Sequence, residues 1–123
     1  MSGNSWLAIA QWFGAAEAPP SLKAIAPWEG LTDTYRDLMN PGGICEPDFN
    51  SMIMNTIVGR GLKEDYVGIG ERNPLANTAY WEDKIPKFDN IRCAVYAVGS
   101  YTSSFHVAGT MRGFRALPGN NKW

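Results

Sequence analysis

The sequence of 123 residues is poor in the residue types that build metal and redox sites. It contains one histidine and two cysteines, and Cys45 and Cys93 lie too far apart to form a Cys-x-x-Cys pair. This spacing suggests neither a zinc site nor a redox motif. We therefore expect no bound metal, and we expect both cysteines to be free thiols that serve in packing.

Long hydrophobic runs and blocks of one charge are also missing. No apolar run approaches the roughly 20 residues that a membrane span needs, and the N-terminus lacks a basic stretch followed by a cleavable apolar segment. Eleven basic and twelve acidic residues give a net charge of -1, without the Lys/Arg block that a nucleic-acid surface requires. We expect a soluble, cytoplasmic protein that binds neither membranes nor nucleic acid.

The chain does contain enough apolar material for one modest core. Hydrophobic residues make up 45% of the sequence and charged residues 19%, which suits at most one globular domain at this length. Helical periodicity, apolar segments and proline or glycine breaks together predict the secondary structure. The expected elements are a helix over residues 6–17, strands over 22–26 and 93–98, helices over 32–39, 47–58 and 105 or 106 to 117, and the start of a strand at 122–123.

A Gly-x-Ser turn at residues 3–5 runs directly into the first helix. A small residue two positions before a serine lets the serine occupy a strained corner between a strand and a helix, with its hydroxyl exposed. This pattern is typical of a nucleophile elbow, although Leu7 stands where the full signature has glycine and only Met1 and Ser2 precede the turn. By itself, such a motif more often marks an ordinary helix start.

Further segments add specificity to this motif. They are residues 3–13, 15–17, 19–20, 22–30, 33 with 35–37, 42–44, 73–75 and 80–86. Together they resemble the cocaine esterase and Xaa-Pro dipeptidyl-peptidase family of α/β-hydrolases over nearly the whole chain. The resemblance implies a partial α/β-hydrolase fold, the C-terminal half of the parallel sheet with a helical cap insertion. It divides the chain into the elbow helix with its following strand over 1–30, the cap over 31–85 and a return to the sheet over 86–123.

The resemblance also implies the chemistry. In that family the elbow serine is the nucleophile, so this role falls on Ser5, and the backbone N–H of Trp6 is one oxyanion donor. The implied activity is that of a serine hydrolase which cleaves a small-molecule ester or a peptide through an acyl-enzyme, with no cofactor. Trp28, Glu29 and Tyr35 are the candidate residues of the substrate pocket.

Each of these pocket residues also has a plainer interpretation. Glu29 is a candidate clamp for a substrate amine, or it makes an ordinary hydrogen bond in the loop after a strand. Tyr35 and the other aromatic and Met side chains of the cap more often fill a core than line a pocket. Asp33, Arg36 and Asp37 are expected to form a local set of ion pairs.

The acid and the base are missing from the places where the family has them. The acid follows the strand equivalent to residues 93–98, yet the loop over 100–104 contains neither Asp nor Glu. The family's histidine follows the strand that begins here at Lys122, so it lies beyond the last residue. The second oxyanion donor belongs to a part of the family that this chain does not contain.

His106, the single histidine, has two possible roles. It is either a replacement general base for Ser5 or a hydrogen-bonding residue of the pocket wall. The second role is favoured for two reasons. A helix N-terminus disfavours an imidazolium, and the candidate orienting carboxylates Glu29, Asp83 and Asp89 are remote in the sequence.

The first residues of the chain bear on stability. Only Met1 and Ser2 precede the turn, so we expect the strand before Ser5 to be absent and the strand over 22–26 to have an unpaired edge that invites self-association. We therefore expect a fragment of a larger hydrolase. Two functional classes remain open: a serine hydrolase, and a catalytically inactive remnant or interaction module that binds a strand of another chain.

Overall fold

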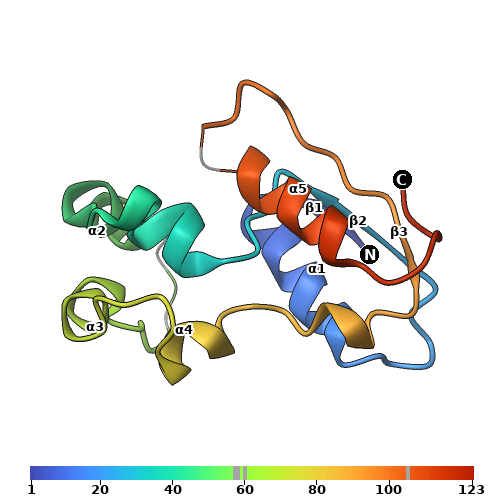
Figure 1. Ribbon diagram of the computed structural model, residues 1–123, viewed down its shortest axis with the longest axis horizontal. Helices are drawn as coiled ribbons and strands as arrows, with labels where there is room; N and C mark the ends of the chain where they lie inside the picture. The colour runs from blue at the N-terminus through green and yellow to red at the C-terminus, as the bar shows by residue number, and fades with distance from the viewer. Residues whose placement is uncertain (57–58, 60, 105) are drawn as a thin grey trace.

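The computed structural model describes residues 1–56, 59, 61–104 and 106–123. Its elements in chain order are β1 (Ser2–Asn4), α1 (Trp6–Ala16), β2 (Ala24–Trp28), the π-helix η1 (Tyr35–Met39), the 3-10 helix η2 (Pro41–Gly43), α2 (Pro47–Thr56), α3 (Tyr66–Arg72), α4 (Ala79–Asp83), the 3-10 helix η3 (Phe88–Asn90), β3 (Ala94–Val95) and α5 (Val107–Ala116). Figure 1 shows the strands with α1 and α5 on one side of the molecule and α2, α3 and α4 on the other. We call the first the sheet part, and we call the second, together with η1 and η2 and the residues that lead into them from Leu31, the helical part.

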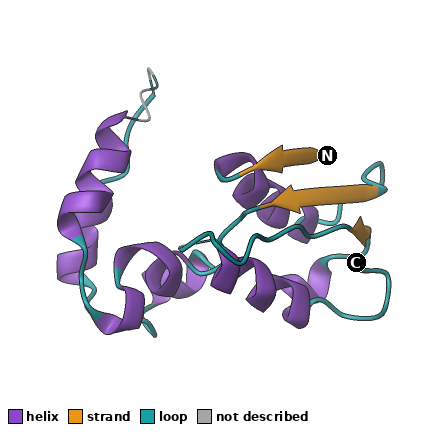
Figure 2. Ribbon diagram, turned by 90° about the horizontal axis from the view of Figure 1, so that it is seen from above, coloured by secondary structure: helices purple, strands orange, loops and turns teal. Residues whose placement is uncertain are grey.

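The sheet is parallel, as expected for the α/β class. Its three strands lie in the order β1-β2-β3, side by side in Figure 2, and the register pairs Gly3 with Pro27 and Ile25 with Val95. An isolated parallel bridge between Val95 and Lys122 extends the sheet where the sequence predicts the next strand to begin. The carboxyl ends of these parallel strands therefore face one edge, which is where α/β folds place their sites.

The strand expected to be absent before Ser5 is present, so that prediction is wrong. Residues Ser2–Asn4 form β1, and β1 pairs with β2. Three extended residues are sufficient because the neighbouring strand supplies a template of backbone donors and acceptors. β2 therefore has a neighbour on each side, and β1 is the outer strand in the described part of the chain. Self-association through a sheet edge stays a prediction, and β1 is the edge it would use.

The two predicted strands differ from the observed ones, and Pro27 explains why β3 is short. The sequence places a strand at 22–26, but β2 begins and ends two residues later and includes the buried Pro27. Ile25 O accepts from Tyr96 N at 2.9 Å and Pro27 O accepts from Val98 N at 3.0 Å, but Pro27 has no N–H to return to Tyr96. The ladder is interrupted there, so β3 covers only part of the extended segment predicted over 93–98.

The helices agree better with the sequence. α1 confirms the helix expected over 6–17, and α5 confirms the helix that ends near residue 117. α2 begins at residue 47 as predicted, whereas η1 is shorter than the helix expected over 32–39. The ends predicted at residues 57–58 and 105 lie outside the described residues.

Each of the two parts has its own apolar cluster as a core. The first, between the sheet and α1, comprises Trp12, Ala15, Ala16, Ile25, Ile91, Val95 and Leu117. The second, in the helical part, comprises Leu31, Tyr35, Leu38, Met39 and Trp81. Each contains a fully buried tryptophan in edge-to-face contact with another ring: Trp12 with Phe88 at 5.9 Å between centroids, and Trp81 with Tyr35 at 5.5 Å.

Two smaller expectations have different outcomes. Both cysteines are free thiols, as expected, and Cys93 packs against the first cluster, but Cys45 is exposed and is not a packing residue. The described residues within 31–85 form helices and no strand, and the division of the chain at residues 30 and 85 stays a prediction.

Candidate active site

Ser5 occupies the strained corner that the sequence predicts. It connects β1 to α1 with φ 56° and ψ -117°, a conformation that side chains other than glycine rarely adopt. Its N–H donates to Trp28 O at 3.0 Å, which continues the sheet hydrogen bonds through the corner. Gly3 permits this tight turn, because a Cβ there would lie 2.5 Å from Leu7 Cβ. The corner thus holds the Ser5 hydroxyl at the carboxyl edge of the sheet.

His106 lies directly beside Ser5. It is the N-cap residue of α5 and is 8% exposed, and its Nε2 lies 3.4 Å from Ser5 Oγ. On the other side of the ring, Nδ1 lies 3.3 Å from Ser103 Oγ. Burial lowers the pKa of the imidazole below its usual range, against the raising influence of the Glu29 and Asp37 carboxylates. The neutral ring that burial favours is the form able to accept a proton.

The carboxylate of Glu29 lies beside the far side of this imidazole. Glu29 Oε2 is 3.8 Å from His106 Nδ1, and Oε1 accepts the backbone N–H of Ser100. Glu29 has φ 54°, so the residue after β2 is strained in the same sense as the residue after β1. Glu29 and His106 are far apart in the sequence, but the structure brings them together, so Glu29 is an orienting carboxylate within reach of the ring.

A small apolar cavity opens beside the serine. Its volume is about 40 Å³, and its walls are Ser5, Trp6, Ile9, Leu31, Leu38, Ile53 and His106. Trp6 is the first residue of α1, so its N–H has no carbonyl acceptor within the helix and is free to bind an anionic oxygen. The cavity therefore combines a hydroxyl, an imidazole and a backbone donor with aliphatic walls.

The three predicted pocket residues, Trp28, Glu29 and Tyr35, do not line this cavity. Trp28 is 46% exposed at the end of β2. Tyr35 is buried in the second cluster, where its hydroxyl donates to Pro74 O at 2.6 Å. The packing interpretation, rather than the pocket one, therefore describes Tyr35.

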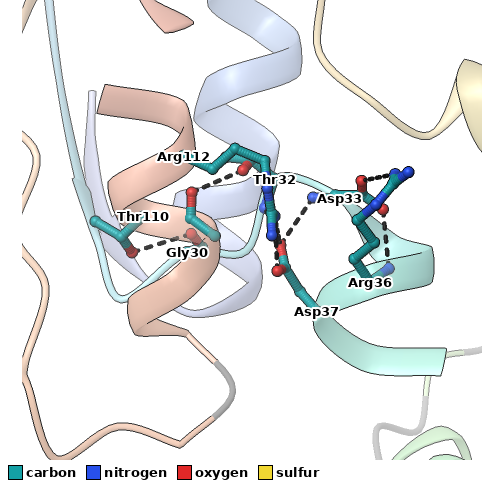
Figure 3. Close-up of polar contacts among 8 residues, drawn as sticks. Gly30, Thr32, Asp33, Arg36, Asp37, Thr110 and Arg112 are labelled. Carbon is teal, nitrogen blue, oxygen red and sulfur yellow. Dashed lines mark hydrogen bonds and ion pairs between the residues drawn. The ribbon is translucent and has the colours of Figure 1, made fainter. Parts of the chain in front are cut away.

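The expected local set of ion pairs is confirmed only in part. Asp33 accepts from Arg36 Nη1 at 2.6 Å, as predicted. Asp37 instead accepts from Arg112 Nη1 at 2.7 Å, far along the sequence on α5 (Figure 3). A spacing rule within one helix cannot reveal such a pair, because it depends on how α5 packs against the segment that follows β2.

The elbow motif contains one signal for the position of Glu29, because an elbow requires a strand before its serine. In the structure Ser5 and Glu29 directly follow β1 and β2, and neighbouring parallel strands end at the same edge. His106 cannot be placed in this way, because its position depends on the loop before α5. Its proximity to Ser5 is a tertiary result.

Two classes of site are not found in the described part of the chain. No group of three or more His, Cys, Asp or Glu side chains there is arranged to hold a metal ion. Among the same residues, no helix has the length and apolar character to cross a bilayer.

Comparison with known proteins identifies relatives of this chain. The family model for X-Pro dipeptidyl-peptidase (S15 family) matches residues 1–67. Two crystal structures of a CocE/NonD family hydrolase from Staphylococcus aureus are similar over 98% of this chain, one with TM-score 0.90 at 31% identity and one with TM-score 0.86 at 29% identity. The chain spans 22% and 23% of the length of those two chains. No curated protein matches it.

These likenesses agree with the parallel sheet, the elbow and the flanking helices. The partial α/β-hydrolase fold predicted from the sequence is confirmed by its superposition on the CocE/NonD hydrolase. The family model covers more than half of the 123 residues and includes both strained corners. The chain belongs to the X-Pro dipeptidyl-peptidase (S15) family of hydrolases.

Proposed function

We propose that this chain carries the nucleophile and general base of a serine hydrolase that cleaves small-molecule esters or peptides. The observation that carries the proposal is the 3.4 Å distance between Ser5 Oγ and His106 Nε2 at a strained corner. A serine hydroxyl is a weak nucleophile unless an adjacent base removes its proton. His106 is the basic side chain placed to do so.

The proposed orientation of the imidazole follows from its neighbours. For Nε2 to accept a proton from Ser5, Nδ1 must carry the ring hydrogen. Ser103 Oγ, 3.3 Å from Nδ1, is an acceptor that favours this tautomer, and the negative charge of Glu29 Oε2, 3.8 Å from Nδ1, favours a hydrogen there electrostatically. After proton transfer, the Glu29 carboxylate stabilises the imidazolium. Glu29 thus has the role of the acid, from a position after β2 rather than after β3.

The reaction then proceeds by acyl transfer. Ser5 Oγ bonds to the carbonyl carbon while its proton moves to His106, and the carbonyl oxygen becomes an oxyanion that the N–H of Trp6 stabilises. Collapse of this intermediate breaks the bond to the leaving group, which takes the proton from His106. Water then repeats the sequence on the acyl-Ser5 ester, with His106 again as base, and releases the acid and free Ser5.

The cavity suggests the size of the group next to the reacting carbon. Its volume of about 40 Å³ accommodates a small apolar substituent, and its aliphatic walls exclude charge. We therefore propose that esters or amides with a short acyl side chain are preferred over bulky ones. Rates of hydrolysis for a series of esters with increasing acyl chain length test this preference, and the short-chain esters should react faster.

Labelling with a fluorophosphonate probe tests the proposal. We expect the 123-residue chain to be phosphonylated at Ser5, with loss of fluoride, and Ser5→Ala to abolish this labelling. His106→Ala should slow it by about a hundredfold to ten-thousandfold, the usual contribution of a general base. Ser2→Ala removes an exposed serine on β1 and is the matched control, expected to label like the parent chain.

A folded chain that is not labelled at Ser5 would contradict the proposal. That result would favour the inactive remnant or interaction module. Labelling that survives His106→Ala unchanged would retain Ser5 as nucleophile but remove His106 as its base.

A further inference from the structure

A buried ion pair fastens α5 to the segment that follows β2. Arg112 Nη1 donates to Asp37 Oδ1 at 2.7 Å and to Oδ2 at 2.8 Å. The Asp37 side chain is 1% exposed, whereas the Arg112 side chain is 37% exposed and extends from α5 toward it (Figure 3). Such a charge-assisted contact is stronger and more directional than a neutral hydrogen bond.

The same carboxylate organises the backbone next to Glu29. Asp37 Oδ2 accepts the N–H of Thr32 at 3.1 Å and the N–H of Asp33 at 2.9 Å. Asp37 therefore holds the chain that leaves the Glu29 corner while it also holds Arg112. One side chain connects two segments that are far apart in the sequence.

Hydrogen bonds between the two segments reinforce this connection. Thr32 Oγ1 donates to Gly109 O at 2.7 Å, and Thr110 Oγ1 donates to Gly30 O at 3.1 Å (Figure 3). Gly109 allows the close approach, because a Cβ at this position would lie 2.7 Å from Leu31 Cα. The contact is too close to accommodate sliding of α5 along the segment.

These contacts lie next to His106, which faces Ser5, and next to Glu29, which faces His106. Glu29 directly precedes Gly30, and His106 lies three residues before Gly109 on the same face of α5. Movement of either segment would therefore change the distances from His106 to Ser5 and from His106 to Glu29.

We propose that Asp37 and Arg112 are positioning residues whose buried ion pair holds His106 and Glu29 in place relative to Ser5. The catalytic consequence rests on the function proposed above, but the positioning itself does not. Asp37 holds α5 through Arg112 and holds the backbone after Glu29 through the N–H groups of Thr32 and Asp33, and these contacts are the route by which it positions the site.

The test uses the 123-residue chain and two readouts. The first is the rate of Ser5 labelling by a fluorophosphonate. The second is the NMR titration of the imidazole C–H resonance, which belongs to His106 without ambiguity because the sequence has one histidine. The charged groups that influence this resonance are Glu29 and Asp37. The variants are Asp37→Asn, Arg112→Ala and Arg112→Lys.

Two controls match these variants. Asp33→Asn removes a carboxylate from the same segment that pairs with Arg36 and not with α5. Arg115→Ala removes an exposed guanidinium from the last turn of α5.

We expect Asp37→Asn and Arg112→Ala to slow labelling by about tenfold to a hundredfold, the effect of a small misplacement of catalytic groups. Both should also shift the His106 resonance and its titration midpoint. Arg112→Lys retains the charge and should recover part of the rate, while both controls should behave like the parent chain. Arg112→Lys also keeps the test informative if Asp37→Asn does not fold.

Folded Asp37→Asn and Arg112→Ala chains that are labelled at the rates of their controls would overturn the inference, as would an Arg112→Ala chain with the His106 resonance of Arg115→Ala. A parent chain that is not labelled, but whose His106 resonance still responds to Arg112→Ala and not to Arg115→Ala, would support positioning while the hydrolase proposal fails, because the charges that act directly on His106 are those of Glu29 and Asp37. The two failures are therefore distinguishable.

Discussion

The sheet part and the helical part are each built around a buried tryptophan, but they differ in what surrounds it. In the described residues, the backbone strain of residues other than glycine is confined to the sheet part, at Ser5, Ala18 and Glu29. In the helical part, the residues with positive φ are Gly42 and Gly43, which adopt it at little cost. Two of the three strained residues, Ser5 and Glu29, therefore belong to the site, whereas Ala18 lies beyond the other end of α1.

The division is also chemical. The sheet part supplies the hydroxyl, the imidazole and the carboxylate of the site, whereas Leu38 and Ile53 of the helical part supply apolar walls of the cavity. The positions of Ser5 and Glu29 depend on the backbone at the ends of β1 and β2. The cavity walls, in contrast, tolerate exchange between aliphatic side chains of similar volume. We expect substitutions in the two parts to separate reactivity from stability.

The largest expected effect is a loss of stability when the buried tryptophan of either apolar cluster is removed. Trp12→Ala and Trp81→Ala each remove a fully buried side chain and should lower the free energy of unfolding by about 3–5 kcal/mol. Only Trp12→Ala should also alter the His106 resonance in chains that remain folded, because Trp12 packs below the sheet and against Gly113 of α5. Chemical denaturation and NMR measure the two effects, and Leu75→Ala, at an exposed position, is the control. Equal effects of both variants on His106 would contradict the division.

Glu29→Gln sharpens the comparison within the sheet part. The amide keeps the shape of the side chain but removes the charge that favours the imidazolium, so Ser5 labelling should slow by about tenfold to a hundredfold. Because Glu29 raises the pKa of His106, the variant should also move the midpoint of the labelling profile to lower pH. Glu64→Gln, in the helical part, removes a carboxylate that pairs with Lys84 and is the matched control. An unchanged profile would mean that Glu29 has no part in setting the protonation of His106.

The buried imidazole also links stability to pH. The pKa of His106 is lower in the folded chain than in the unfolded chain, so the unfolded chain binds the extra proton first. Burial of the neutral imidazole therefore makes a contribution to the free energy of unfolding that depends on pH. The contribution is fully present above the pKa of the unfolded chain, about 6.5, and is lost as the pH falls towards the pKa of the folded chain. The free energy of unfolding changes in this range by at most about 1.4 kcal/mol per pH unit. Unfolding measured from neutral pH to about 5 should show a loss that is smaller in His106→Gln. An identical loss in both chains would assign it to other groups.

The smallest expected effect concerns the third strained residue. Ala18 has φ 48° in the turn after α1, and glycine adopts this conformation without a Cβ penalty. Ala18→Gly should therefore raise the free energy of unfolding, by about 1 kcal/mol or less. Ala10→Gly, inside α1, should lower it by a similar amount, about 0.8–1 kcal/mol, because glycine is unfavourable in a helix. A loss of stability in Ala18→Gly would show that the turn is not strained at this residue.

Local patterns predict the elements of this fold more accurately than its contacts. α1 and α5 follow from helical periodicity and from the proline breaks, and the Gly-x-Ser turn identifies the strained corner at Ser5. β1 is missed because a strand of three residues has no periodic signal of its own and depends on β2 as a template. β3 is predicted too long because a ladder fails where the opposite residue is Pro27, which lies on another segment.

The residues of the site also differ in how far the sequence predicts their positions. Ser5 is identified from its neighbours in the sequence, whereas the approach of Glu29 and His106 depends on sheet order and on the contact between α5 and the segment after β2. The ion pair between Asp37 and Arg112 joins residues 75 positions apart, so no spacing rule within one element predicts it. The contacts of the site between residues far apart in the sequence are thus the ones that the sequence does not predict.

The Glu29 carboxylate has a consequence for the motions of the site. It accepts the N–H of Ser100 while its other oxygen faces His106, so this amide exchanges its hydrogen with solvent when the carboxylate leaves its place. Hydrogen exchange at Ser100 therefore measures how often the site comes apart on the slow timescale of local opening, in the absence of any substrate or probe.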